Sequence, residues 1–167
     1  MASPPRARRL AEIGIVAALY AVLTWLPGLS AISYGALQFR VAEVLKPLVI
    51  WEPHLIPAFV IGNFLSNLFS PNAPAWELLF MPLANLVGAS VCYLLGRRSP
   101  VGGAALYALI IASAVALMLS VLLQVPFAVL FPGLLLSEGI LIIGGVPIMR
   151  ALLRAVEPAR RRWVVSR

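Results

Sequence analysis

Three charged side chains, those of Arg40, Glu43 and Lys46, occur at three-residue steps within an otherwise apolar stretch of the chain. If this stretch is a membrane helix, the spacing places all three within an arc of roughly 120°, on one face. Charged groups at membrane depth are costly and usually face a cavity or a partner. The stretch therefore predicts a helix whose charged face serves a binding site.

Two glutamates in other apolar segments, Glu77 and Glu138, indicate which ligand such a site would take. A carboxylate accepts two parallel donors from an amidine-like edge or pairs with an amine. The glutamates therefore suggest a donor-rich or cationic ligand.

An amide stripe adds to this site, since Asn63 and Asn67 lie one helical turn apart and require polar partners. The structural alternative for any single residue is a hydrogen bond to a neighbouring helix, with Arg40 paired to Glu43. Taken together, the set favours an outward-facing polar pocket.

Aromatic residues near the same end of the predicted helices, Tyr34, Phe39 and Trp76, are able to stack on a flat ring. Interfacial anchoring explains Trp76 equally well. The candidate substrate-binding residues are Gln38, Arg40, Glu43, Asn63, Asn67, Trp76, Glu77 and Glu138.

Enzyme chemistry is not expected from this chain. It contains no Gly-rich loop ending in Lys and Ser or Thr, and so no phosphate-binding loop for ATP. Its one histidine, His54, and its one cysteine, Cys92, do not make a metal site. His54 also lies at the opposite end of the predicted helices from Glu77 and Glu138. We expect no catalytic residue, no metal and no cofactor.

The elements that position these residues follow from composition. With 167 residues, 62% of them hydrophobic and 11% charged, the chain is too apolar for a soluble domain and too long for a single anchor. It is predicted to be an all-α integral membrane protein, a bundle of six transmembrane helices. Pro, Gly and charged clusters divide the apolar runs into helices near 10–26, 38–51, 54–70, 76–96, 103–124 and 132–155. The second and third are short for a ~30 Å hydrocarbon core, which suggests a wet cavity.

The basic residues predict the orientation of the bundle. Arginines occur at 6–9, 97–98 and 150–167, and six spans put all three groups on one side of the membrane. The positive-inside rule then places both termini in the cytoplasm of a multi-pass plasma-membrane protein, with the polar residues gathered toward the outer face. The expected divisions are a cytoplasmic segment 1–9, a membrane domain 10–156 and a basic cytoplasmic tail 157–167.

A face of small residues marks the first predicted helix, which carries Gly14, Ala17, Ala18 and Ala21 at three- and four-residue spacings. Such patterns let two helix backbones approach closely. The face is therefore expected to dock another helix, either of this chain or of a partner.

Several motifs resemble those of the QueT family, the queuosine-precursor family among the substrate-binding S components of energy-coupling factor (ECF) transporters. The motifs are Ala17-xxx-Ala21, Gln38-Phe39-Arg40-xx-Glu43, Gly62-Asn63-xxx-Asn67-xx-Ser70-Pro71 and Ser137-Glu138. The chain departs from the family pattern at Ala75-Trp76-Glu77 and at Lys46. These departures concern the ligand more than the fold.

The resemblance implies a membrane protein that captures 7-deazaguanine-type precursors, such as 7-aminomethyl-7-deazaguanine, and passes them inward through an energising module. That module comprises a transmembrane T subunit and two cytoplasmic ATPase subunits, and it would dock at Ala17 and Ala21. An S component for another vitamin or heterocycle and a solitary carrier remain as alternatives. No nucleic acid partner is expected, because the basic residues flank membrane spans.

Overall fold

The computed structural model describes residues 6–25, 39–68 and 77–165, with the side chains of the last segment described as far as residue 156. Every element in these ranges is helical, which confirms the all-α class. The elements are the α-helix α1 (Arg6–Trp25), the 3₁₀-helices η1 (Val41–Ile50) and η2 (Pro53–Leu55), and the α-helices α3 (Ile56–Leu68), α4 (Glu77–Gly96), α5 (Pro100–Leu123) and α6 (Phe127–Val165).

Three of the described helices are long and apolar enough to cross a membrane: α4, α5 and the part of α6 between Phe127 and Val156. The first turns of α1 are charged, and η1 and α3 have only 10 and 13 residues. About 20 apolar residues are needed to cross the hydrocarbon core. A bundle of six full crossings and the cytoplasmic position of both termini therefore stay predictions.

Three helices begin earlier than expected, namely α1 at Arg6, α5 at Pro100 and α6 at Phe127. Ser99 caps α5, because its hydroxyl accepts a hydrogen bond of 3.1 Å from the Gly102 amide and Pro100 occupies the first turn. In α6 the expected start at Pro132 was wrong, since the helix begins at Phe127 and passes through that proline. It also continues to Val165, through most of the expected tail, which makes α6 ~58 Å long.

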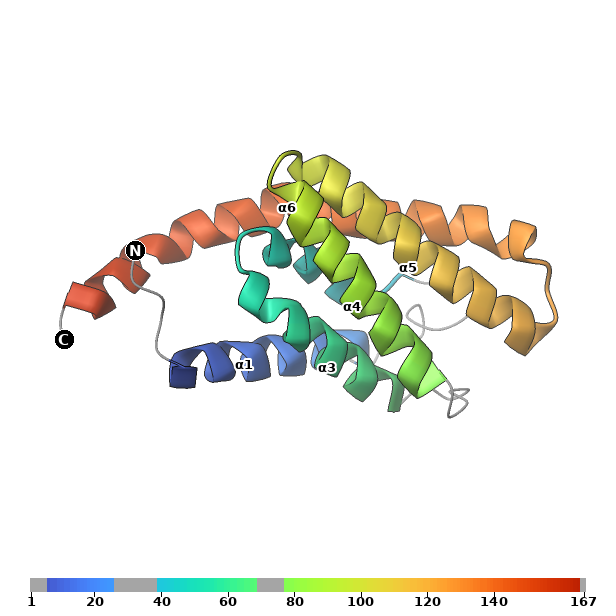
Figure 1. Cartoon of the computed structure of the whole chain (residues 1–167), viewed down its shortest axis with the longest axis horizontal. Coiled ribbons are helices and arrows are strands. Elements are labelled where there is room, and N and C mark those ends of the chain that lie inside the picture. Colours follow the sequence, from blue (N-terminus) through green and yellow to red (C-terminus); the bar gives the residue numbers. More distant parts are fainter. Residues whose placement is uncertain (1–5, 26–38, 69–76, 166–167) are drawn as a thin grey trace.

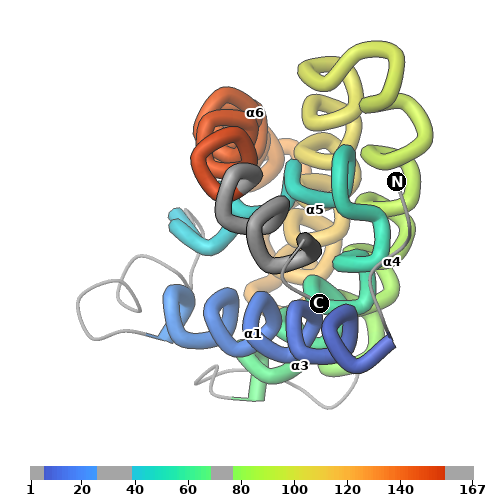
Figure 2. Tube along the Cα trace, turned by 90° about the vertical axis from the view of Figure 1, so that its left-hand side faces the viewer, coloured from blue at the N-terminus to red at the C-terminus, as the bar shows by residue number. Residues whose placement is uncertain are grey.

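The helices form a ring, and η1 closes it between α1 and α6. Along the chain α1 packs on α3, α3 on α4, α4 on α5 and α5 on α6, and η1 contacts α1, α4, α5 and α6 (Figure 1). An end-on view shows η1, coloured cyan, between α1 and α6 (Figure 2). Thus η1, which carries two of the buried charged residues, closes the bundle.

The backbones of α6 and η1 meet directly at Gly145. A Cβ atom added there would lie 2.4 Å from the Val44 carbonyl oxygen, too close for any side chain. Glu138 lies two helical turns before Gly145, on the same buried side of α6. Gly145 therefore sets how closely the last helix covers the charged residues of η1.

Candidate functional site

The 3₁₀ geometry of η1 aligns Glu43 and Lys46. With three residues per turn, side chains at positions i and i+3 point in the same direction, more closely than they would on an α-helix. Both side chains are fully buried inside the ring of helices. The Lys46 ammonium forms an ion pair with the Glu43 carboxylate.

Tyrosines from α1 and α5 hold this ion pair in place. The Tyr20 hydroxyl of α1 donates a hydrogen bond to the Glu43 carboxylate. The Lys46 ammonium lies 4.8 Å from the centre of the Tyr107 ring of α5, within range of a cation–π interaction. The pair is therefore fixed by three elements of the bundle.

Arg40 takes a different partner from the one expected. It precedes the first turn of η1 with an extended backbone, at φ −82° and ψ 95°, so its side chain departs from the line of Glu43 and Lys46. Its guanidinium donates to the Asn67 side-chain oxygen at 3.4 Å, and the Asn67 amide donates to Asn63 at the same distance. Among the described residues, Glu43 thus forms its ion pair with Lys46 and not with Arg40.

The two remaining glutamates enter the cluster from α4 and α6. Glu77, the first residue of α4, is buried and close enough to Arg40 for an electrostatic interaction. Glu138 of α6 is also buried and interacts electrostatically with Glu43, Lys46 and Arg40. Its carboxyl group lies within hydrogen-bonding reach of the Glu43 carboxyl group, while its Oε2 atom has no hydrogen-bond partner.

Six of the candidate substrate-binding residues are thus brought together in one buried polar cluster: Arg40, Glu43, Asn63, Asn67, Glu77 and Glu138. The other two, Gln38 and Trp76, lie outside the described residues. Together with Lys46, the described interior holds five charged side chains. The candidate binding site of this bundle therefore lies at its centre.

Four members of this cluster were not among the candidates: Tyr20, Lys46, Asn85 and Tyr107. The Tyr107 hydroxyl donates to the Asn85 side-chain oxygen at 3.0 Å, and the Asn85 amide donates to the Met81 carbonyl at 3.0 Å. The signal that could have found Asn85 is an amide in the middle of an apolar helix. Tyrosine gives a weaker signal, because it also anchors helices at membrane interfaces.

The position of Tyr107 depends on Gly88 of α4. A Cβ atom added at Gly88 would lie 2.3 Å from the Tyr107 ring. The Tyr107 ring thus occupies the space that a side chain at position 88 would fill. Its hydroxyl donates to Asn85, which lies one turn before Gly88 on α4.

A second polar cluster joins α1 to η2. His54 Nε2 lies 2.7 Å from one oxygen of Glu12, whose other oxygen accepts from Arg8 Nε at 3.0 Å. His54 Nδ1 lies 3.5 Å from Glu52. No group of three His, Cys, Asp or Glu side chains suited to a metal ion occurs in the part of the chain that the structure describes. His54 is thus a contact between elements, away from the buried polar cluster.

The small residues of α1 do not share one environment. Ala17 is buried against α3, where a Cβ added at Gly62 would lie 3.0 Å from the Ala17 carbonyl oxygen. Gly14 and Ala18 are exposed, and Ala21 is half-buried. Ala17 therefore serves packing within the chain, while docking of a partner on the exposed residues stays a prediction.

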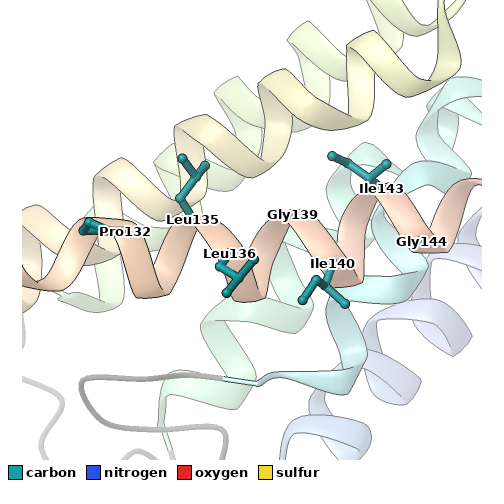
Figure 3. Close-up of a pocket in the computed structure, with 7 residues that line it drawn as sticks. All are labelled: Pro132, Leu135, Leu136, Gly139, Ile140, Ile143 and Gly144. Atoms are coloured by element: carbon teal, nitrogen blue, oxygen red, sulfur yellow. The ribbon is translucent and has the colours of Figure 1, made fainter.

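The outer side of α6 carries an apolar groove of 590 Å³ (Figure 3). Its lining residues are Pro132, Leu135, Leu136, Gly139, Ile140, Ile143 and Gly144. Glu138 is on the opposite, buried side of the helix. With no polar side chain in its lining, this groove suits lipid chains and not a polar ligand.

Comparisons with known proteins give a family match. A family model described as "QueT transporter" matches residues 10–154. A curated relative, the "Queuosine precursor transporter QueT" of Lactococcus lactis subsp. cremoris (strain MG1363), is 51% identical over 61 residues, or 36% of this chain and 36% of the relative. The match thus spans about a third of that relative's length. No solved structure matches the chain.

Proposed function

The chain belongs to the QueT transporter family, a family of transporters and not of enzymes, and from this premise we propose that it is the S component of an ECF transporter. It captures a queuosine precursor of the 7-deazaguanine type, such as 7-aminomethyl-7-deazaguanine, at the outer face of the plasma membrane. The observation that carries this proposal is the buried polar cluster, to which α1, η1, α3, α4, α5 and α6 all contribute side chains. A purely structural role would not require so many charged groups in an apolar interior.

The roles of the site residues follow from their chemistry. The Glu77 carboxylate accepts paired hydrogen bonds from the amidine-like edge of the base, which presents two parallel donors. Asn63 and Asn67 read the ring carbonyl and ring nitrogens, since an amide offers both a donor and an acceptor. Arg40, held by Asn67, keeps the amide stripe in one orientation. Gln38 and Trp76 complete the set as a further amide and a ring for stacking.

The partners in this proposal are a transmembrane T subunit and two cytoplasmic ATPase subunits. The chain has no phosphate-binding loop of its own, so the energy for import must come from elsewhere. Gly14 and Ala18 on the exposed side of α1, together with the half-buried Ala21, offer the T subunit a surface for close helix packing.

The first test is a binding screen on the purified full chain in detergent. A ligand that binds the folded state raises its apparent thermal stability by mass action. Selective stabilisation by 7-deazaguanines over purines, pterins and common vitamins is the expected result. Stabilisation by another heterocycle would replace the substrate and keep the S-component architecture.

Two further measurements sharpen this test. Glu77→Ala is expected to weaken binding by about 1–3 kcal/mol, because it leaves donors of the base unpaired in a buried site. Glu52→Ala, at the second polar cluster, is the control and should bind normally. Co-expression with T and ATPase subunits should give a stable complex, whereas transport by the chain alone would indicate a solitary carrier.

A further inference from the structure

Among the described residues, the buried polar cluster holds one more carboxylate than it holds cations. Its charged groups, all at most 3% exposed, are the carboxylates of Glu43, Glu77 and Glu138 and the cations of Arg40 and Lys46. The segments 26–38 and 69–76, which lie outside the described residues, contain no charged amino acid. With every group ionised, the cluster would have a net negative charge in an apolar interior, which is strongly unfavourable.

Contacts within the cluster show where the excess lies. Lys46 forms an ion pair with Glu43, and Arg40 interacts electrostatically with Glu77. Glu138 enters from α6, and its carboxyl group lies within hydrogen-bonding reach of the Glu43 carboxyl group. Lys46 thus lies beside two carboxyl groups, and its charge balances only one of them.

Contact between two carboxyl groups requires a proton. An ionised carboxylate only accepts hydrogen bonds, so two carboxylates within hydrogen-bonding reach repel each other unless one has a proton to donate. We propose that Glu43 and Glu138 share one buried proton. The two groups then have a single negative charge, which Lys46 neutralises, and the buried polar cluster as a whole is neutral. The proton belongs to the chain without a ligand, whichever heterocycle the chain binds.

The groups around Glu43 and Glu138 do not remove the need for this proton. The titratable and charged groups that face the two carboxyl groups or their partners come from α1, η1, α4, α5 and the residue before η1: Tyr20, Lys46, Glu77, Cys92, Tyr107 and Arg40. Tyrosine and cysteine are uncharged at neutral pH. The described part of α3 contributes only uncharged side chains. No third cation therefore faces the two carboxyl groups within the described residues.

The shared proton makes the contact between α6 and η1 sensitive to pH. While the proton is bound, the hydrogen bond joins Glu138 of α6 to Glu43 of η1. When the pH rises and the proton leaves, two carboxylates repel each other and the cluster becomes negative. The backbones of α6 and η1 approach closely at Gly145, two helical turns after Glu138, so the repulsion acts beside a tightly packed contact. The packing of α6 on η1 is therefore expected to loosen at high pH.

Infrared spectroscopy of the purified full chain in detergent tests for the proton directly, because a protonated carboxyl group has a carbonyl stretching band that a carboxylate lacks. At neutral pH the wild-type spectrum is expected to contain the band of one such group. Glu138→Gln and Glu43→Gln should each abolish it, since either variant leaves two carboxylates for two cations. The matched control Glu12→Gln changes a carboxylate outside the buried polar cluster and should keep the band.

Thermal unfolding at a series of pH values is the second measurement. With the shared proton, the folded chain binds one more proton at neutral pH than the unfolded chain, in which glutamates are ionised. Its stability must then fall as the pH rises and this proton is lost. Glu138→Gln has no shared proton to lose, so the wild type is expected to lose stability relative to this variant at high pH. Glu12→Gln should follow the wild type.

The outcomes separate the shared proton from the transport function. A wild-type spectrum without the band of a protonated carboxyl group overturns the proposal. A band that survives in either Glu43→Gln or Glu138→Gln also overturns it, because one carboxyl group then holds a proton without the other. Neither result bears on the proposed function, which the binding screen tests separately. If neither variant folds, the wild-type spectrum still decides, since a chain with every carboxylate ionised has no such band.

Discussion

Two polar clusters in this chain use the same chemistry at very different burial. The buried polar cluster ties α1 to η1 through Tyr20, Glu43 and Lys46, with side chains 0–1% exposed. The second cluster ties α1 to η2 through Glu12 and His54, and its side chains are 15–24% exposed. Water can replace a lost partner in the second cluster and cannot in the first. The same type of contact is therefore expected to matter far more in the interior.

The largest effect is expected from Lys46→Met, which leaves the Glu43 charge buried without its cation. We expect a loss of about 3–5 kcal/mol in the free energy of unfolding, measured by denaturant titration in mixed micelles. The double variant with Glu43→Gln should recover a large part of this loss, since it removes the stranded charge. A single variant as stable as the wild type would mean that water reaches the ion pair.

Tyr20→Phe removes one hydrogen bond to a buried carboxylate and leaves the ring in place. The expected loss is about 1.5–3 kcal/mol, the range for hydrogen bonds to charged groups. Thermal unfolding in the same micelles measures it. Tyr93→Phe, on α4 outside the buried polar cluster, is the control and should change little.

Gly88→Ala tests whether the interior tolerates a single added carbon. The new methyl group would displace the Tyr107 ring and its bond to Asn85, at a cost of about 1–3 kcal/mol. Gly144→Ala places the same carbon in the open apolar groove of α6, where nothing lies within 4 Å. That variant should be neutral or up to about 1 kcal/mol more stable, because alanine favours helix. Equal effects of the two changes would contradict the tight packing at Tyr107.

The smallest effect belongs to Glu12→Gln in the second cluster. It weakens contacts to Arg8 and His54 that are partly solvated, so the expected loss is about 0–1 kcal/mol. High salt should reduce the difference from the wild type further, since it screens exposed ion pairs. A loss as large as that of Lys46→Met would remove the contrast between the two clusters.

The sequence allowed prediction of the helical class and of which polar residues gather, because intramembrane charges and amides are rare and need partners. Which residues pair was harder to foresee. The partner of Glu43 depends on η1 being a 3₁₀-helix, and the partner of Arg40 depends on where α3 lies.

Tyr20 and Tyr107 were missed for a related reason. In a sequence, a tyrosine in an apolar run is equally typical of an interface anchor or of the core. Only the packing of α1 and α5 on η1 turns both side chains toward the charges.

The position of Glu138 in the last helix has a consequence for biogenesis. Chains emerge from the ribosome N-terminus first, so η1 enters the membrane well before α6 is made. Glu43 and Lys46 are three residues apart and neutralise each other within η1 itself. This short segment therefore has no net charge before the later helices are inserted. Glu138 arrives last, when the ring is nearly closed, and so it is the final buried charge of the described residues to be inserted.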